Sequence, residues 1–398
     1  MLWTLLAFSS AVVYWVYAGY GQFLQILCGL RRFSPSGRRA EVLSGSTFSD
    51  ASDLPSIAVL ITAHNEEHHI RARIQNLISC RYPAERVEIV VASDGSTDQT
   101  ADVVRRMQAD PEIRVKIQLY ETPGAGKTAT QNIVLKEIDA DVVVFTDADM
   151  IFDRDFLWHV GHCMLNPNVG AVAGYLLFGA EGQRPEVSGQ GFYWSYELKL
   201  RDLETRLGLL AVAAGSCFAV RRSLILPMNP AIGEDCIVPL DVVAQGYQVI
   251  QDPRAIAYDT FEFGSQVVLK KRIRMTLRNW QGTWTRPELL NPLRHPGYAF
   301  ALWSHKLLRW LSPVFLLVAT LCATSLFILH PQLMTAAVLS PFVGLFLLAA
   351  CGWLGPRNGI RIPGTSAAFS FVLANTAFLI GVFRALTGQR VHSYRNTV

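Results

Sequence analysis

Long segments without charge constrain the fold of this chain more than any other feature. Residues 1–30 contain no charged side chain, and neither do residues 311–329, 333–354 and 365–383. Each of these four segments is long enough to cross the hydrocarbon core of a bilayer as a helix, which takes about 20 residues. Only 17% of the whole chain is charged, whereas soluble proteins are usually near about 25%. We therefore expect part of the chain to lie in lipid.

Basic residues orient the first segment. Four arginines follow it within nine residues: Arg31, Arg32, Arg38 and Arg39. A secretory signal peptide has its basic residues before a shorter apolar core, so residues 1–30 are expected to remain as a transmembrane helix. Because basic residues mark the cytoplasmic side of a span, residues 31–54 are predicted to be a cytoplasmic linker. We expect a multi-pass protein of the inner (plasma) membrane whose next domain faces the cytoplasm.

The charge pattern at the other end of the chain conflicts with a simple topology. One span before the cytoplasmic domain and three spans within residues 311–398 would put the C-terminus outside. Five arginines near the last spans favour the inside: Arg357, Arg361, Arg384, Arg390 and Arg395. Either one of the three segments is re-entrant, or the rule fails in this chain.

Residues 55–265 show the alternation of an α/β domain. Apolar runs predict strands at residues 57–62, 87–93, 115–120, 141–146, 169–175, 215–220, 248–251 and 255–258. Helices are predicted between them at residues 66–79, 98–107, 127–138, 192–206 and 234–245. Strand and helix in turn, with short connections, favour a doubly wound, Rossmann-like and mostly parallel sheet.

Residues 266–310 are expected to form amphipathic helices at the membrane surface. Within them, residues 298–310 combine aromatic side chains with His305, Lys306 and Arg309. Such a mixture suits a helix that lies in the interface between lipid and water.

The strand predicted at residues 141–146 is followed by two carboxylates, Asp147 and Asp149. Two acids at the end of a buried strand repel each other, so they are tolerated most easily where a divalent cation or solvent neutralises them. In an open α/β sheet, the carboxyl ends of the strands are also where ligands bind. The pair therefore predicts a metal or nucleotide site. Two acids in a solvated turn are the alternative.

Polar residues also follow the first two predicted strands. Residues 63–67 read Ala-His-Asn-Glu-Glu, and residues 93–98 read Ser-Asp-Gly-Ser-Thr-Asp. Helix capping is one explanation, with Asn65 as one cap and a hydroxyl at position 96 or 97 as the other. Asp94 precedes its cap and is expected to be free to accept a hydrogen bond from a base or ribose. Two such strand ends in register favour a nucleotide site.

The segment Pro123–Thr128, Pro-Gly-Ala-Gly-Lys-Thr, is similar to the phosphate-binding loop of ATPases. That loop requires another glycine at position 121, where this chain has Glu121. A carboxylate there would oppose a bound anion. We therefore expect Lys127 to lie near a diphosphate without a full phosphate loop, with a solvated lysine at a helix start as the alternative.

Two motifs follow further along the chain. Glu234 and Asp235 open a predicted helix, where acids complement the helix dipole. An acid there would also suit a sugar transfer, as the base that takes the proton of the attacking hydroxyl. Arg278 and Trp280 lie two residues apart and cannot share one helical stripe. We expect a helix end that lets both face a pocket; anchoring to lipid headgroups is the alternative.

The composition limits the kinds of partner and metal site that the chain is expected to have. The net charge is +4, and basic residues gather beside apolar segments rather than along one stripe, which argues against nucleic-acid binding. The seven cysteines are scattered without a Cys-x-x-Cys pair, so neither a disulfide framework nor a zinc site is expected. Such cysteines suit a reducing cytosol.

Together these motifs resemble those of the family 2 inverting glycosyltransferases. They occur in the family's order: Ala63–Glu67, Ser93–Asp98, Lys127, Asp147–Asp149, Gly233–Asp235 and Arg278–Gly282. The resemblance covers residues 56–285. It is closest to the membrane-integrated branch, which includes cellulose, hyaluronan and poly-N-acetylglucosamine synthases.

The resemblance implies a GT-A fold, a UDP-sugar donor and a Mg²⁺ or Mn²⁺ ion. It implies a nucleotide-sugar pocket formed by Ala63, Asn65, Glu66, Asp94, Lys127, Asp147 and Arg278. Asp147 and Asp149 would hold the metal, with Asp149 the more direct ligand. Asp235, next to Glu234, would be the general base, and Trp280 would stack on the acceptor sugar. No nucleophile from the enzyme is needed, so inversion is expected.

One departure from the family concerns the length of the product. Polymerising synthases carry Gln-x-x-Arg-Trp, whereas this chain has Thr276-Leu-Arg278-Asn-Trp280, without the glutamine and with one residue inserted. We predict transfer to a growing extracellular polysaccharide or a lipid-linked acceptor. The alternative is a single transfer to a polyprenyl-phosphate or glycolipid, and a P-loop transport ATPase is a remote one.

Overall fold

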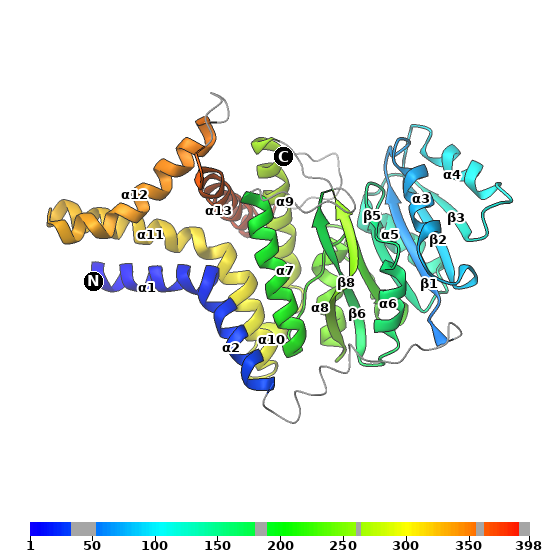
Figure 1. Ribbon diagram of the computed structural model, residues 1–398, viewed down its shortest axis with the longest axis horizontal. Helices are drawn as coiled ribbons and strands as arrows, with labels where there is room; N and C mark the ends of the chain where they lie inside the picture. Colours follow the sequence, from blue (N-terminus) through cyan, green and yellow to red (C-terminus); the bar gives the residue numbers. More distant parts are fainter. Residues whose placement is uncertain (33–52, 180–188, 260–263, 356–361, 390–398) are drawn as a thin grey trace.

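The computed structural model describes residues 1–32, 53–179, 189–259, 264–355 and 362–389. A mixed sheet with the order β3-β2-β1-β4-β7-β6-β8-β5 forms its centre (Figure 1). Its strands are β1 (Ile57–Ala63), β2 (Val87–Asp94), β3 (Lys116–Thr122), β4 (Val142–Asp147), β5 (Ile151–Phe152), β6 (Val169–Phe178), β7 (Cys217–Arg221) and β8 (Gln248–Asp259). The first four strands are parallel, whereas β7 runs antiparallel to β4 and β6. This mostly parallel, Rossmann-like sheet with apolar helices beside it confirms the predicted fold class.

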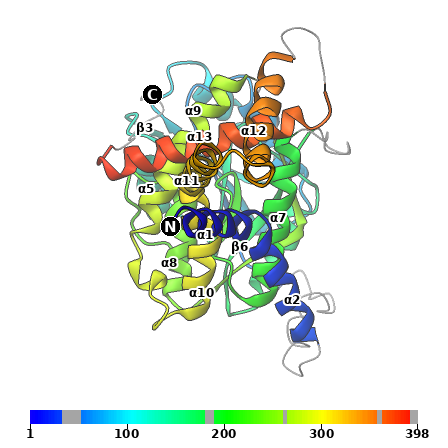
Figure 2. The same cartoon turned by 90° about the vertical axis from the view of Figure 1, so that its left-hand side faces the viewer.

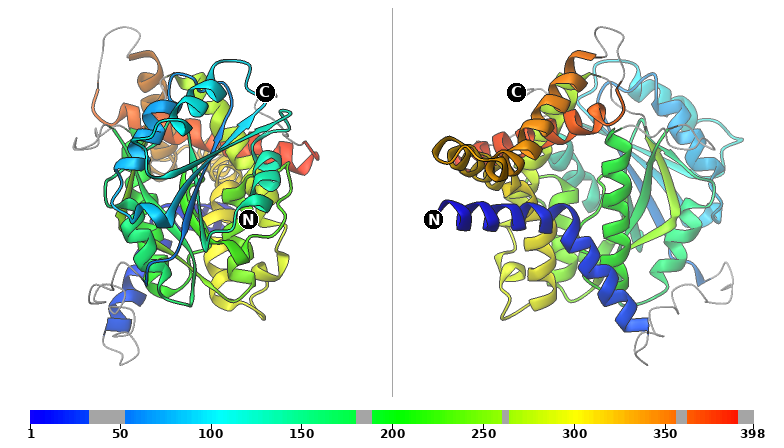
Figure 3. Two further views of the ribbon diagram at one scale, coloured as in Figure 1. Left: turned by 90° about the vertical axis from the view of Figure 1, so that its right-hand side faces the viewer. Right: turned by 60° about the vertical axis from the view of Figure 1, so that its left-hand side comes forward.

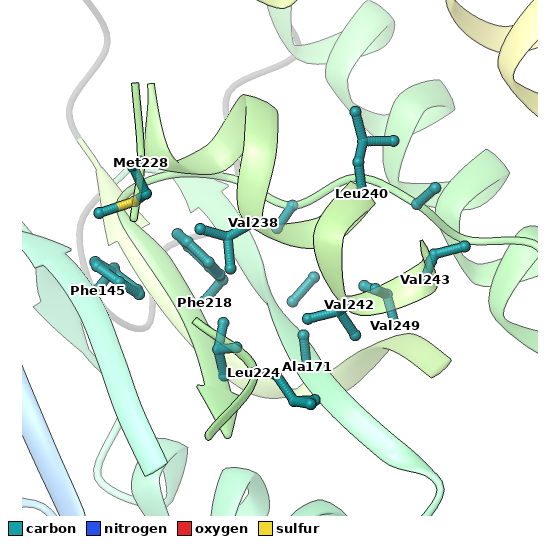
Figure 4. Packing of buried hydrophobic residues seen from close by; sticks show 14 of the residues in the cluster. Phe145, Ala171, Phe218, Leu224, Met228, Val238, Leu240, Val242, Val243 and Val249 are labelled. Carbon is teal, nitrogen blue, oxygen red and sulfur yellow. The ribbon is translucent and has the colours of Figure 1, made fainter. Parts of the chain in front are cut away.

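Helices cover both faces of the sheet, which explains the continuous apolar runs of its central strands. One face packs against α3 (Ile70–Ser79), α4 (Thr100–Gln108) and α6 (Phe156–Met164). The other packs against α5 (Lys127–Val134) and α8 (Glu234–Ala244). On that second face, the rings of Phe145 and Phe218 stack with centroids 4.8 Å apart beside Val238 of α8 (Figure 4).

Several element ends differ from the sequence predictions. Helix α3 begins at Ile70 instead of residue 66, and α4 begins at Thr100 instead of residue 98. Residues 248–258 form one strand, β8, with an irregular register around Pro253 instead of two strands. The residues that precede α3 and α4 form loops at the edge of the sheet.

Four helices in the described part of the chain are long and apolar enough to cross a membrane: Leu2–Arg31, Pro296–Leu329, Leu333–Leu354 and Thr365–Leu386. They comprise α1 (Leu2–Tyr14), η1 (Trp15–Gly19), α2 (Tyr20–Arg32), α10 (Pro296–Ala301), η9 (Leu302–Leu307), α11 (Leu308–Leu329), α12 (Leu333–Leu354) and α13 (Thr365–Leu386). The surface helix predicted at residues 298–310 is therefore continuous with the next apolar helix and not separate from it. Most of the predicted linker, residues 33–52, lies outside the described residues.

The first two apolar helices bend at π-helical segments, η1 and η9, which lie side by side. Trp15 Nε1 donates to Ser304 Oγ at 3.2 Å, and the rings of Trp15 and Phe300 meet edge to face. A π-helical turn interrupts the regular hydrogen bonds of an α-helix, and such an interruption is a common cause of bends. Beyond the bends, α1 and α11 run together away from the sheet, while α2 and α10 turn along it (Figures 1 and 3).

A buried carboxylate, Glu197 of α7 (Gly189–Leu207), connects the sheet domain to the second apolar helix. It accepts hydrogen bonds from Arg309 Nη1 at 2.6 Å, His305 Nε2 at 2.9 Å and Lys306 Nζ at 3.2 Å. Burial opposes its ionisation, but His305 and the other cations outweigh this and hold the pKa of Glu197 well below its usual range. The three basic residues that the sequence assigned to a lipid surface thus make buried ion pairs.

A second acid of α7 extends this cluster to the first apolar helix. Glu204 Oε1 lies 2.8 Å from His305 Nδ1 and accepts a hydrogen bond from Tyr20 of α2 at 2.7 Å. Glu204, His305 and Tyr20 are each at most 2% exposed. We call Glu197, Glu204, His305, Lys306 and Arg309 the junction cluster.

Replacing Glu197 by alanine should destabilise the protein strongly. The substitution leaves Arg309 and His305 buried without their main anion, which typically costs about 3–5 kcal/mol. Thermal unfolding of the purified protein in detergent, followed by intrinsic fluorescence, should show a much lower midpoint. Asp202→Ala on the same helix is the control, because its ion pair with Arg206 is exposed and worth less than about 1 kcal/mol. Equal midpoints for the two variants would contradict this role of the junction cluster.

Candidate active site

The carboxyl ends of β1, β2 and β4 meet at one edge of the sheet. Ala63 lies opposite Ser93, and Thr62 lies opposite Asp147. Asp94 is paired with Thr122, so the segment after β3 reaches the same edge. The structure thus brings together the polar segments that the sequence singled out. We call this the carboxyl edge.

Hydrogen bonds tie the segments after β1 and β2 to each other. Asn65 has a left-handed φ of 58°, and its Oδ1 accepts from the Thr97 amide at 2.8 Å. The Glu66 amide donates to Thr100 Oγ1 at 2.8 Å. The two loops therefore form one unit beside the strand ends.

The capping roles suggested for Asn65 and for positions 96 and 97 are wrong. The two helices begin several residues later, and Asp98 Oδ1 accepts the hydrogen bonds of the Thr100 amide and hydroxyl. Asn65 joins two loops and begins no helix. Its structural role is therefore to hold the two loops together and not to cap a helix.

Asp94 is 3% exposed and is held by the neighbouring loop. Its Oδ1 accepts from Thr130 Oγ1 at 2.8 Å and from the Gly126 amide at 3.2 Å. The expectation that Asp94 is free of protein partners is therefore wrong for this oxygen. Gly95 has a φ of 61°, and a Cβ on it would lie 2.8 Å from Gly124 Cα, so the two loops pack without room for a side chain.

Lys127 is the cation at the centre of the carboxyl edge. Its Nζ lies 2.6 Å from Asp147 Oδ1 and 2.7 Å from Glu234 Oε1, and its side chain is only 13% exposed. It is thus not a solvated lysine at a helix start. Through this one ammonium group, the end of β4 is joined to the start of α8.

The two carboxylates after β4 have different surroundings. Asp149 is exposed, whereas Asp147 is partly buried and paired with Lys127. Behind them lies Arg73 of α3, which is 2% exposed and donates to Thr146 Oγ1 at 2.8 Å. Burial lowers the pKa of Arg73 to about 10, and the charges of Asp147 and Asp149 oppose this shift. Sequence reasoning missed Arg73, because nothing in a surface-like helix pattern marks it out.

Glu234 and Asp235 have shifted pKa values of opposite direction. Burial raises the pKa of Asp235, and the adjacent Glu234 carboxylate raises it further. Burial acts on Glu234 too, but Lys127 and Arg278 outweigh it and lower the pKa of Glu234. One acid is therefore held ionised, while its neighbour has an increased affinity for a proton. Such a pair of environments suits a general base at the second acid.

Arg278 of α9 (Ser265–Thr283) faces the two acids of α8. A Cβ on Gly233 would lie 2.5 Å from Asp235 Oδ1 and 3.3 Å from Arg278 Cζ, so carboxylate and guanidinium flank the same glycine. Arg278 Nη2 is 3.4 Å from Thr128 Oγ1. Its buried Nε has no hydrogen-bond partner among the described residues. An unpaired guanidinium nitrogen at this place fits an anionic ligand.

Trp280 lies apart from Arg278. It is 9% exposed, and its ring contacts those of Trp284 and Trp310, each with centroids 6.1 Å away. Both Arg278 and Trp280 lie inside α9, which continues to Thr283, so the chain does not change direction at these residues as expected. Two residues apart on a helix means about 200° around its axis. A role for Trp280 in acceptor binding stays a prediction.

The acids of the carboxyl edge fit a metal that arrives with a ligand. Across the described ranges, no three His, Cys, Asp or Glu side chains are grouped so as to hold a metal ion. Asp147 and Asp149 offer carboxylate oxygens, which suit Mg²⁺ or Mn²⁺. Mg²⁺ commonly binds through one or two carboxylates and completes its shell with phosphate oxygens and water.

The chain is similar in sequence to known glycosyltransferases. Residues 58–226 match the family model described as Glycosyl transferase family 2. The probable glycosyltransferase YdaM of Bacillus subtilis (strain 168) is 27% identical over 273 residues, 64% of this chain and 61% of that protein. An N-acetylglucosaminyltransferase of Azorhizobium caulinodans is 26% identical over 251 residues, 59% of this chain and 62% of that protein. The poly-beta-1,6-N-acetyl-D-glucosamine synthase of Staphylococcus aureus (strain COL) is 23% identical over 220 residues, 52% of this chain and 50% of that protein.

The chain spans at most 62% of the length of these curated relatives. Among solved structures, the mannosyltransferase PcManGT from Pyrobaculum calidifontis, in complex with GDP-Man and Mn²⁺, matches 97% of this chain and 99% of its own, with a TM-score of 0.68 and 20% sequence identity. Since nearly all of both chains is covered, the likeness includes the apolar helices. The likeness therefore shows the fold, a GT-A sheet domain joined to apolar helices.

Removing the ammonium group of Lys127 should destabilise the carboxyl edge, and a second substitution should partly reverse this. Lys127→Met leaves the Glu234 carboxylate buried without its main cation, an effect of about 3–5 kcal/mol. Adding Glu234→Gln removes that unpaired charge and should recover at least about 1 kcal/mol. Denaturant unfolding of the single and double variants measures both effects. Purely additive destabilisation would contradict the pairing.

Proposed function

We propose that the protein, whose residues 58–226 match the model of glycosyl transferase family 2, is a membrane-embedded inverting glycosyltransferase. It would transfer a sugar from a UDP-sugar to a growing extracellular polysaccharide or a lipid-linked acceptor. The observation that carries the proposal is the bridge of Lys127 between Asp147 and Glu234, beside Asp235 and Arg278. This arrangement would provide both a diphosphate site and a base.

The nucleotide-activated sugar would bind along the carboxyl edge. Ala63, Asn65, Glu66 and Asp94 would line the part that receives the base and ribose, since they lie at or just after the carboxyl ends of β1 and β2. Lys127 and Arg278 would contact the diphosphate; the unpaired Nε of Arg278 supports this. A Mg²⁺ or Mn²⁺ ion held by Asp149 and Asp147 would, when bound, neutralise charge on the departing nucleotide.

The transfer itself would need only one proton acceptor from the protein. Asp235 would take the proton of the acceptor hydroxyl as that oxygen attacks the anomeric carbon. The bond from this carbon to the phosphate oxygen breaks, and the nucleoside diphosphate leaves toward Lys127 and Arg278. A single in-line displacement inverts the anomeric configuration. The raised pKa of Asp235 supports the assignment, because a base is most effective when its pKa approaches the working pH.

A single transfer to a polyprenyl-phosphate or glycolipid is the second candidate. Two observations favour it: the altered order around Arg278, and the burial of Trp280 against Trp284 and Trp310. The transport ATPase receives no support. The Gly126 amide of the phosphate-loop-like segment donates to the Asp94 carboxylate, a contact that an incoming phosphate would have to replace.

Purified protein in detergent or nanodiscs should release a nucleoside diphosphate and transfer sugar from at least one nucleotide sugar. A screen of UDP-sugars, with GDP-mannose included, identifies the donor. Asp235→Asn should retain donor binding within about twofold and lose transfer by at least about 100-fold, the range of general-base effects. Wild-type transfer should also fall as pH is lowered through the pKa of Asp235, since the protonated acid accepts no proton. Asp202→Asn is the control, because Asp202 is a partly exposed acid of α7 that pairs with the exposed Arg206. Normal turnover by Asp235→Asn would contradict the assignment.

The same assay separates the two candidate products. With a labelled donor and a membrane extract as acceptor, a growing polysaccharide gives a ladder of long products. A single transfer gives one organic-soluble glycolipid. ATP hydrolysis that is lost in Lys127→Ala, without transfer from any donor, would favour the ATPase.

Donor binding should depend on a divalent cation through Asp149. Titration calorimetry with Mn²⁺ present should show at least tenfold weaker donor binding for Asp149→Ala, and chelation should weaken wild-type binding similarly. Asp155→Ala is the matched control, because Asp155 is also an exposed acid close in sequence, 3.7 Å from Arg81. Donor binding that is indifferent to both chelation and Asp149→Ala would contradict the metal site.

A further inference from the structure

Helix α13 is one of the four helices long and apolar enough to cross a membrane, yet its direction differs from that of the others. In Figure 2, α1 and α11 are seen nearly end-on, whereas α13 runs across the view. In Figure 1 the relation is reversed, since α1 and α11 lie lengthwise and α13 is seen nearly along its axis. We propose that α13 does not cross the bilayer but lies along its surface, on the side of the sheet domain, with one apolar face in the lipid.

The two helices before α13 set the level of the membrane surface. Helix α11 begins at the junction cluster, where Arg309 pairs with Glu197 of the sheet domain, and then runs away from the sheet (Figure 1). A short turn around His330 leads into α12, which comes back. The last turn of α12, near Gly352, is therefore again on the side of the sheet domain.

The contacts of α13 all lie on that same side. At its start, a Cβ on Gly352 would collide with the Thr365 backbone, so α13 begins beside the returning end of α12. In its middle, Asn375 Oδ1 accepts from Ser312 Oγ at 2.9 Å, one turn beyond Arg309 in α11. It also accepts from the hydroxyl of Tyr17, in the bend of the first helix, at 3.1 Å.

The end of α13 lies against α9, the helix that carries Arg278. A Cβ on Gly381 would lie 2.7 Å from Thr276 Cβ, and Gln281 Nε2 donates to the Gln389 carbonyl at 2.8 Å. With 22 residues, α13 is about 33 Å long. A crossing would carry its end to the opposite face of the bilayer, whereas both its start and its end contact elements on the side of the sheet domain.

The two faces of α13 agree with this position. Its buried residues recur with helical spacing on the face toward α9 and α11: Ala374, Asn375, Ala377, Phe378, Gly381 and Val382. Leu379, Phe383 and Leu386 are exposed on the opposite face. In the proposed orientation this exposed apolar stripe would face the acyl chains of the lipid. The occupant of this surface would be the lipid leaflet into which α11 and α12 already pass.

With α13 at the membrane surface, the number of spans no longer conflicts with the side of the membrane that the C-terminal arginines favour. With α1, α11 and α12 as the only crossings, the C-terminus lies on the side of the sheet domain. Arg384 at the end of α13, and Arg390 and Arg395 after it in the sequence, are then on the side that basic residues favour. This position of α13 follows from contacts outside the active site and does not depend on the reaction that the protein catalyses.

Cysteine labelling in membrane vesicles tests the topology in the full-length protein. Cys28 and Cys351, which are the cysteines not buried in the described chain, are first replaced by serine. A membrane-impermeant maleimide is then applied to right-side-out and inverted vesicles with single cysteines at three exposed positions: Gln389→Cys, His330→Cys and Glu112→Cys. Gln389→Cys should be labelled from the same face as Glu112→Cys in the sheet domain and from the face opposite to His330→Cys. Labelling of Gln389→Cys together with His330→Cys would overturn the proposal.

Depth measurements test the orientation of α13 directly. Spin labels at Thr376→Cys and Leu386→Cys, ten residues apart, should report nearly equal depths by oxygen and nickel accessibility. The matched pair Ala337→Cys and Leu347→Cys on the crossing helix α12 should differ markedly, since ten residues of helix rise about 15 Å. A depth difference in α13 as large as that in α12 would show that α13 crosses.

Discussion

The buried carboxylate of Glu197 is the interaction on which the arrangement of the two halves depends. A single ionised carboxylate in a protein interior is unfavourable, and Glu197 is tolerated because Arg201, His305, Lys306 and Arg309 surround it. Three of these cations belong to the second apolar helix, Pro296–Leu329. Sliding that helix relative to α7 would separate buried charges, so the sheet domain is held in one position relative to this helix. Glu204 and Tyr20 add the first apolar helix to the same fixed unit.

The sheet and the place of its site follow from local sequence pattern, because apolar runs ending in polar residues are a property of each segment alone. The strand ends at Ala63, Ser93 and Asp147 were predictable in this way, and the parallel register brings them together. The ion pairs are different. His305 and Arg309 beside aromatic residues have the same local pattern whether they face lipid headgroups or a carboxylate more than 100 residues away. Only the tertiary structure separates these two cases.

The same reason explains which features of the site were missed. The place of Lys127 after β3 predicts that it lies near a diphosphate, whereas its pairing with Glu234 joins segments that no local pattern connects. Arg73 and Arg71 lie in the same helix, and only their orientation makes Arg73 buried and Arg71 exposed. The failed expectations about Asn65 and Asp94 have a related cause. Their side chains bond to a neighbouring loop, whereas sequence reasoning considered only the helix that follows each of them.

Helix α9 connects α13 with the carboxyl edge. Thr276, which packs against Gly381 of α13, precedes Arg278 by two residues on the same rigid helix. If α13 lies in the lipid–water interface, any change in its depth moves α9 and shifts Arg278 relative to Gly233 and Asp235. The bilayer would then set the height at which the base and the leaving-group cation meet an acceptor. A hydroxyl or phosphate presented at headgroup level suits this geometry, which is why the placement of α13 bears on the choice between a membrane-borne and a soluble acceptor.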